Sequence, residues 1–480
     1  MRNATTSPGP MTFRDPRTFR GPALAVLSVT QFLIALDYSV IYVALPSVAR
    51  DLRLDPALAQ WVISAYAVLF AGFLMVGGRL ADRVGAKGLF IVAITLFGVT
   101  SAIGGTAADG TVLLAARGAQ GFGAALLQPA VLGLIGTTFP AGAARSRALA
   151  VWGSVGASGL AAGAILGGLL TTASWRLTFF VNVPITLLCA LGAGRWFGPA
   201  GDRNRASRIP VLASILGTGA VLALVVGLTL SAGQGWESAS TLLPLGLALL
   251  LVVGFVHNEH RSPRVLVERV LRRTRSLGTG VAATALYMAS VGSEFYLVTL
   301  LLQSAKDYTP LRAGLAFLPL AGMVTFGSMA AGRAVHKLGA PTVLISGFTV
   351  AAIGLGLLSF TLSGDSYVVD LLPGLVISGF GHGAIYTSMF IIGTQDVPAR
   401  HQGAAGALLT TSQYLSAAVT VAVLTLVLGA SPDNDSYRAA FLVTGAAAAA
   451  GTLLTAAQRR RLSTTPATTP CGTPYARPAR

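Results

Sequence analysis

The feature that most constrains this chain is a series of fourteen apolar runs separated by short charged or Gly/Pro-rich breaks. A hydrocarbon core about 30 Å thick needs about 20 helical residues, so each run is long enough to cross a bilayer. The runs are 22–45, 58–78, 88–107, 111–134, 147–170, 177–196, 210–230, 240–257, 278–302, 313–333, 340–361, 370–392, 402–429 and 436–457. We therefore predict an all-α polytopic membrane protein with fourteen transmembrane helices.

The basic residues indicate how these helices are oriented. An even number of spans puts both termini on one side, and about 27 of the 34 Lys and Arg residues fall on that side. The opposite loops hold Arg50, Arg53, Arg176, Lys306, Arg312 and Arg438. Cytoplasmic loops carry the excess of Lys and Arg, so we expect both termini in the cytoplasm of a cell-membrane protein. This placement also explains the net charge of +17 without nucleic acid.

An internal repeat relates the two ends of the chain. A shift of 254 residues aligns Gly78–Ala86 with Gly332–Ala340 and Pro56 with Pro310, without a gap. The two matched segments follow the second and the tenth predicted spans, so the offset is eight helices. A six-helix repeat with two inserted helices produces that offset.

On these residues the chain resembles the major facilitator superfamily, and within it the fourteen-span drug:proton antiporter family of bacterial multidrug and antibiotic efflux transporters. The resemblance implies a major facilitator fold of two six-helix halves plus two inserted central helices. The expected divisions are an N-terminal cytoplasmic segment 1–21, an N-terminal half 22–196, the inserted pair with its basic linker 197–277, a C-terminal half 278–457 and a disordered cytoplasmic tail 458–480.

The stretch Gly78 to Lys87 matches the superfamily's signature loop between the second and third spans. Its glycines permit a tight turn and close helix approach, and its aspartate suits a position near helix N-termini. The resemblance implies a conformational gate between the halves. The expected gate residues are Gly78, Asp82, Arg83, Gly85 and Lys87.

Two charged residues within spans are the expected proton-coupling residues. Asp37 lies in the first span, in a stretch Leu36–Pro46 that resembles the family's first-span motif, although Ser39 and Tyr42 replace the usual threonine and asparagine. A carboxylate inside a membrane is costly and therefore functional by default, the alternative being a purely structural acid held by a buried partner. Arg117 lies in a stretch similar to the family's fourth-span motif. In the family this arginine is associated with proton transfer; the alternative is that it snorkels to the outer surface.

The fifth span resembles the glycine-rich motif of the superfamily's exporters, with Gly156, Gly159, Gly163 and Gly167 as the expected helix-packing positions. Such spacing makes a groove for a neighbouring helix, whether or not the protein is an exporter. The family's prolines are replaced by Leu160 and Ala164, which removes a helix-bending element.

Glu294, in the ninth span, is a third candidate for proton coupling or for a cationic substrate. The repeat maps it to Val40, one helical turn from Asp37. A local hydrogen bond to a neighbouring helix is the alternative. The remaining candidates for a substrate cavity are Gln31, Tyr38, Tyr66, Gln128, Tyr287, Tyr386 and Gln413, each of which also suits helix packing, as does His382.

Residue patterns for other chemistry are missing from the sequence. It holds neither a phosphate-binding Gly-Lys-Ser/Thr loop nor a His-Glu-x-x-His motif, and Cys189 and Cys471 suggest neither a disulfide nor a metal site. We therefore predict no enzyme activity, no catalytic residues, no cofactor and no metal. The hypothesis is a monomeric proton-coupled exporter of small amphipathic or cationic compounds that works by alternating access. The alternatives are an importer or uniporter of the same fold, and a non-transporting sensor or scaffold.

Overall fold

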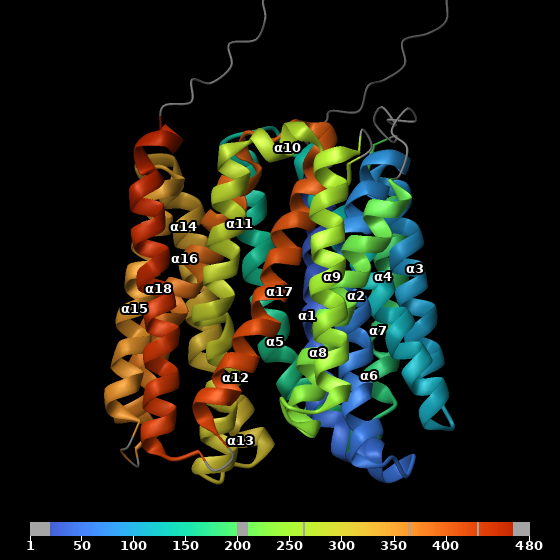
Figure 1. Ribbon diagram of the computed structural model, residues 1–480, viewed down its shortest axis with the longest axis vertical. Helices are drawn as coiled ribbons and strands as arrows, with labels where there is room; N and C mark the ends of the chain where they lie inside the picture. Colours follow the sequence, from blue (N-terminus) through green and yellow to red (C-terminus); the bar gives the residue numbers. More distant parts are fainter. Residues whose placement is uncertain are drawn as a thin grey trace, which may run out of the picture.

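The chain folds into a bundle of roughly parallel helices (Figure 1). A computed structural model describes residues 20–198, 210–262, 265–362, 364, 366–429 and 432–463, and these residues contain no strand. Residues 1–19 and 464–480, most of the predicted terminal segments, lie outside the described residues. α18 continues past the predicted end at 457 to Ser463, so the first residues of the predicted tail are helical. Basic residues such as Arg459 are favourable at the carboxyl end of a helix, which accounts for the extension.

The N-terminal half and the inserted pair follow the predicted spans closely. Their helices are α1 Arg20–Asp51, α2 Pro56–Val84, α3 Ala86–Gly105, α4 Gly110–Thr138, α5 Ala143–Ala173, α6 Leu177–Phe180, α7 Asn182–Trp196, α8 Val211–Gln234 and α9 Ala239–Arg261. The predicted sixth span is thus two helices, α6 and α7, which meet at Val181.

The basic linker and the C-terminal half contain the remaining elements. They are α10 Arg269–Arg273, α11 Arg275–Tyr287, η1 Met288–Gly292, α12 Ser293–Leu300, η2 Leu301–Ala305, α13 Pro310–Ala316, α14 Leu318–Leu338, α15 Ala340–Thr361, η3 Tyr367–Leu371, α16 Leu372–Gln395, η4 Ala399–His401, α17 Gln402–Leu428 and α18 Asn434–Ser463. The predicted ninth span is interrupted by η1, where Ser290 has non-helical backbone angles (φ −112°, ψ −107°).

Among the described residues, thirteen helical stretches are long and apolar enough to span a bilayer. α5 is not one of them, but its 31 residues are long enough, at 1.5 Å per residue, to cross a 30 Å core. It packs extensively along α1 and α14 inside the bundle. With α5 the arrangement is the predicted six, two and six spans.

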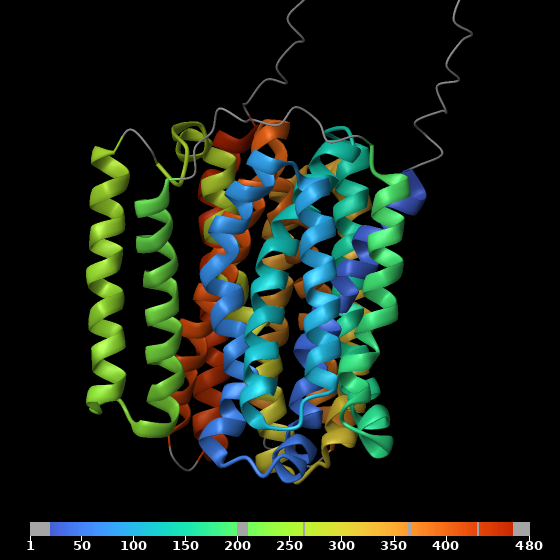
Figure 2. The same cartoon turned by 90° about the vertical axis from the view of Figure 1, so that its right-hand side faces the viewer.

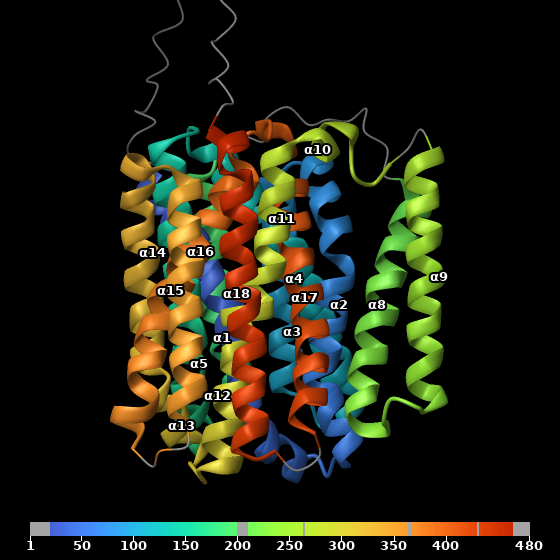
Figure 3. The same ribbon diagram turned by 60° about the vertical axis from the view of Figure 1, so that its left-hand side comes forward.

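The inserted helices stand at the side of the bundle (Figures 2 and 3). α8 packs against α2 and, more weakly, α17, whereas α9 packs mainly on α8. The two halves meet where α5 contacts α14 and where α2 contacts α17. The insert therefore touches both halves without separating them.

The internal repeat is visible in the backbone. Gly85 and Gly339, which the 254-residue shift aligns, end α2 and α14 with φ of 93° and 79°. These left-handed angles are accessible mainly to glycine. Pro56 and Pro310 are likewise equivalent as first residues of α2 and α13. Both halves thus make the same sharp turn at the same end of the bundle.

Both ends of the described chain lie at one end of the bundle, which we call the basic end (Figure 1). It holds the carboxyl ends of α2, α7 and α14, the amino ends of α5 and α17, and the short helix α10. Most of the described arginines and lysines are in these segments, in η4, at the amino ends of α1, α3 and α11, or at the carboxyl ends of α9 and α18.

Candidate functional site

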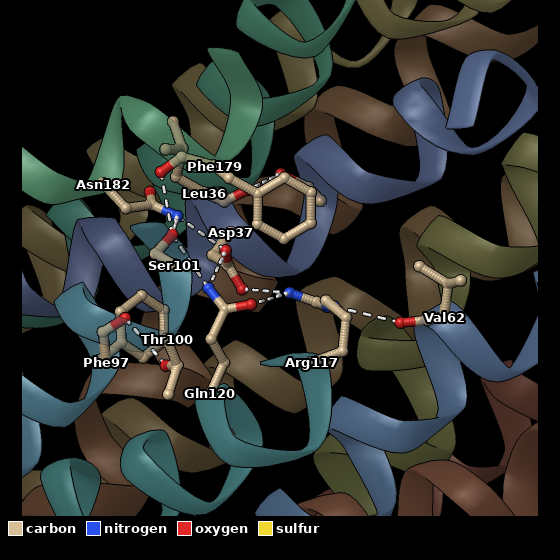
Figure 4. Close-up of polar contacts among 11 residues, drawn as sticks. Leu36, Asp37, Val62, Phe97, Thr100, Ser101, Arg117, Gln120, Phe179 and Asn182 are labelled. Carbon is tan, nitrogen blue, oxygen red and sulfur yellow. Dashed lines mark hydrogen bonds and ion pairs between the residues drawn. The ribbon is translucent and has the colours of Figure 1, made fainter. Parts of the chain in front are cut away.

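Asp37 and Arg117 form a buried ion pair within the N-terminal half (Figure 4). The distance from Arg117 Nη1 to Asp37 Oδ2 is 2.8 Å, and each residue is only 1% exposed. Arg117 Nε also donates to the Val62 carbonyl at 3.1 Å, and the guanidinium lies 4.6 Å from the centre of the Tyr66 ring. The arginine therefore points into the half and does not snorkel to the surface.

Two amides complete the surroundings of the Asp37 carboxylate. Gln120 Nε2 and Asn182 Nδ2 donate to Oδ1 at 3.2 and 2.8 Å. With Arg117, the carboxylate thus receives three donors from α4 and α7. Donors alone suit an ionised carboxylate, since a protonated acid needs an acceptor for its own hydrogen.

Ser101 ties this network to two further helices. Its hydroxyl accepts from Gln120 at 3.1 Å and Asn182 at 3.0 Å, and donates to the Phe179 carbonyl at 2.9 Å (Figure 4). The break between α6 and α7 is therefore connected directly to Asp37. Gln120, Ser101 and the contact of Asn182 with Asp37 were not predicted from the sequence. Gln120 follows Arg117 by three residues, a spacing that places both on one helix face.

Glu294 occupies a separate buried site in the C-terminal half. It is fully buried on α12, and Ser378 Oγ on α16 donates to its Oε1 at 2.6 Å. Among the described residues, its Oε2 has no hydrogen-bond partner and no cation pairs with it. The structure thus does not join Glu294 to Asp37, and the two acids differ in that Asp37 alone has a counter-charge.

A second polar contact lies one helical turn from the first. Tyr287 on α11 hydrogen-bonds His382 on α16, four residues beyond Ser378. Tyr287 and Glu294 both belong to the predicted ninth span, and the irregular segment η1 lies between them. Both polar contacts therefore join the broken ninth span to α16.

The other cavity candidates are distributed over both halves. Tyr386 on α16 stacks on Trp152 of α5 with ring centres 5.8 Å apart, and lies 5.7 Å from Tyr287. Tyr38 and Tyr66 are neighbours at 6.5 Å. Gln31 contacts α5 at Gly156, while Gln128 is buried and Gln413 half-buried. Three of these polar atoms, Gln31 Oε1, the Tyr66 hydroxyl oxygen and Gln128 Oε1, are buried without a partner among the described residues.

The predicted gate stretch contacts the opposite half at two of its positions. Gly78 faces Ala404 and Ala407 of α17 so closely that a Cβ at Gly78 would lie 2.5 Å from the Ala407 Cβ. The Asp82 carboxylate lies against the first turn of α17, where its Oδ1 would be 2.8 Å from a Cβ at Gly403, and its Oδ2 has no hydrogen-bond partner among the described residues. The amino end of this 27-residue helix favours an anion through the helix dipole.

The other three gate candidates stay within their own half. Lys87 Nζ donates to the carbonyls of Gly194 and Phe197, at 3.2 and 2.7 Å, and so binds the carboxyl end of α7. Gly85 forms the turn, and Arg83 makes no hydrogen bond or ion pair to the residues that the structure describes. Only Gly78 and Asp82 of the predicted set bridge the halves.

The four predicted packing glycines of α5 all face α1, the helix that carries Asp37. Gly156 packs on Gln31, Gly159 on Phe32 and Ala35, Gly163 on Leu36 and Ser39, and Gly167 on Val40 and Val43. The two helices make the most extensive contact in the bundle. The groove therefore fixes the position of α1.

Helix arrangement and buried charges together define a polytopic membrane transport protein. The chain belongs to the Major Facilitator Superfamily, whose family model matches residues 27–421. Solved structures with this fold include a proton:xylose symporter, XylE (TM-score 0.66, 14% identity, 93% of this chain and 96% of that one) and the human organic anion transporter MFSD10 (TM-score 0.67, 14% identity, 91% and 99%). These likenesses concern the fold alone.

Curated relatives are more similar in sequence. The puromycin resistance protein pur8 of Streptomyces alboniger is 35% identical over 418 residues, 86% of this chain and 82% of the relative. The cephamycin export protein CmcT of Amycolatopsis lactamdurans is 34% identical and covers 87% of both chains. The tetracenomycin C resistance and export protein of Streptomyces glaucescens is 31% identical over 85% of this chain and 76% of the relative.

Proposed function

We propose that this protein exports small amphipathic or cationic compounds by exchanging them for protons across the cell membrane. The observation that carries the proposal is the buried Asp37–Arg117 pair. Charged residues inside transmembrane helices are costly to insert, so they are functional by default. The printed names of the relatives, which include resistance and export, favour outward transport of drug-like molecules.

The basic end is the cytoplasmic end in this proposal, since cytoplasmic loops carry the excess of Lys and Arg. There α17 packs against Gly78 and Asp82, so the contact between halves is closed on the cytoplasmic side. Alternating access would break this contact and open the protein to the cytoplasm.

Proton coupling follows from what a proton would do at Asp37. Protonation of Asp37 removes the negative partner of the Arg117 charge. The amides of Gln120 and Asn182 would then donate to a neutral acid in place of a carboxylate. Arginine keeps its proton, so its only response is to shift toward another acceptor. Because the network joins α1, α3, α4 and the α6–α7 break, protonation would loosen these helices together.

Aromatic residues where the halves meet, and Glu294 on the broken ninth span, support an amphipathic or cationic cargo. Trp152, Tyr386 and Tyr287 offer ring faces suited to planar or cationic compounds. Glu294 would accept either a cationic substrate or a second proton.

The proposal is tested in everted membrane vesicles that contain the protein. A proton gradient is imposed and monitored with a pH-sensitive dye, and puromycin, tetracenomycin C, a cephamycin and the lipophilic cation ethidium are added in turn. Dissipation of the gradient by at least one compound, with its accumulation in the vesicles, supports export. Accumulation without proton movement would indicate a uniporter, and movement of compound and protons in the same direction an importer. No transport of a broad panel would favour a sensor or scaffold.

Glu294→Gln is expected to reduce the transport of ethidium about tenfold or more while transport of neutral compounds changes less. The substitution keeps the shape and the acceptor for Ser378 but removes the negative charge that a cation would need. Initial rates in the same vesicles measure the effect.

Glu237→Gln is the matched control, since Glu237 is an exposed residue in the loop between α8 and α9. If Glu294→Gln vesicles transport cationic compounds as fast as the control vesicles do, and neutral compounds likewise, Glu294 only stabilises the contact with α16.

A further inference from the structure

The linker that follows the inserted helices meets both halves at the basic end. Glu268, at the amino end of α10, forms an ion pair with Arg79 of α2, and its other oxygen lies 3.4 Å from His401 Nε2 at the start of α17. Arg79 also donates to the Val265 carbonyl at 2.7 Å. One linker carboxylate thus touches side chains of the N-terminal and the C-terminal half.

Apolar contacts repeat the same three-way arrangement. A small pocket is lined by Leu266, Val267 and Leu271 of the linker together with Met75 and Arg79 of α2 and Ala404, Ala407 and Leu408 of α17. Leu266 and Leu271 are 3% and 2% exposed. The linker is therefore packed into the junction between α2 and α17, next to Gly78 and Asp82.

Glu259, near the end of α9, holds the linker in shape. Its side-chain carboxylate accepts hydrogen bonds from the backbone N–H groups of Leu266 at 2.5 Å and Val267 at 3.2 Å. Arg272 Nη1 donates to the backbone carbonyl of Glu259 at 3.1 Å. Glu259 is itself 6% exposed. The inserted pair thus presents Glu268 to both halves on a hydrogen-bonded support.

We propose that the inserted helix pair controls access at the basic end through its linker, with Glu268 as a clamp that holds α2 and α17 together. The proposal rests on the alternating access put forward above. When α2 and α17 separate, Glu268 cannot remain beside both Arg79 and His401, so opening breaks at least one contact. Loss of the clamp favours the state that is open at the basic end.

Distance measurements between spin labels test the clamp without a substrate. Val84 and Leu338 are repeat-equivalent, 39% and 60% exposed, and end α2 and α14 at the basic end. Both are changed to cysteine in the full chain with Cys189→Ala and Cys471→Ser, reconstituted in lipid nanodiscs. Double electron–electron resonance then gives the populations of short and long distances.

Glu268→Gln is expected to raise the long-distance population about tenfold, because the charge-assisted contact that ties Arg79 of α2 to the linker beside His401 is lost. Arg79→Glu should do the same, and the charge swap Arg79→Glu with Glu268→Arg should restore at least part of the short distance. Glu237→Gln is the control and should leave the populations unchanged. Unchanged populations in Glu268→Gln, with opening in Asp82→Asn, would overturn the clamp and leave alternating access standing. If Asp82→Asn, Glu268→Gln and a change of pH all leave one distance, alternating access itself fails and the clamp with it.

Discussion

Asp37→Asn is expected to reduce proton-driven export to the level of vesicles that lack the protein. Asparagine fits the same volume, but it cannot take up or release a proton and cannot balance the Arg117 charge. The substitution leaves a buried guanidinium without its partner, which typically costs about 3–5 kcal/mol of stability. We therefore expect a lower thermal midpoint as well as lost transport, and both are measured on purified protein and in vesicles.

A double substitution separates these two effects. Arg117→Gln added to Asp37→Asn removes both charges and leaves side chains that can hydrogen-bond with Gln120 and Asn182. Replacing a buried pair as a whole is far less costly than removing one partner, so the midpoint should recover. Export should stay absent, because no titratable group remains in the network.

Recovery of gradient-driven export in the double variant would contradict proton coupling at Asp37 and support the purely structural alternative. Substrate-driven proton movement that persists in Asp37→Asn would do the same. Counterflow of labelled compound without a gradient provides a control, since exchange of substrate across the membrane does not require net proton transfer.

Much of the fold could be predicted from sequence because bilayer thickness and backbone hydrogen bonding leave few choices. The lengths of the apolar runs predict the transmembrane helices. The repeat of Gly78–Ala86 as Gly332–Ala340 predicts two halves and an inserted pair. The breaks at Val181 and Ser290 were not predicted, because both lie inside apolar runs that read as one helix.

The charged residues of the candidate site could be singled out from the sequence, whereas their neutral partners could not. Asp37 and Arg117 stand out because charge is rare within spans, whereas Gln120 and Ser101 resemble ordinary packing residues. The contacts of Glu268 to Arg79 and His401 could not be predicted either, because they join segments far apart in sequence. Such contacts depend on how helices pack, which apolar periodicity does not specify.

Gly159→Leu is expected to abolish export, and Gly159→Ala to reduce it about tenfold, because Gly159 lies directly against α1. A Cβ there would lie 2.6 Å from the Phe32 carbonyl oxygen and 2.9 Å from the Ala35 Cβ. Overpacking of this kind costs about 1–3 kcal/mol even when neighbours adjust. α1 would have to move away from α5, and Asp37 would move with it relative to Arg117 and Asn182.

Gly246→Ala and Gly246→Leu are the matched controls, because Gly246 lies inside α9 with no atom within 4 Å of an added Cβ. They should leave export near the parental rate. Helix bending at proline does not complicate the comparison, because α5 has Leu160 and Ala164 where the family's prolines would stand. The comparison therefore tests the close packing of the glycine groove by itself. If Gly159→Leu exports as well as Gly246→Leu, close packing on α1 is dispensable. If it fails while staying folded and monodisperse, close packing of α5 on α1 is required for transport.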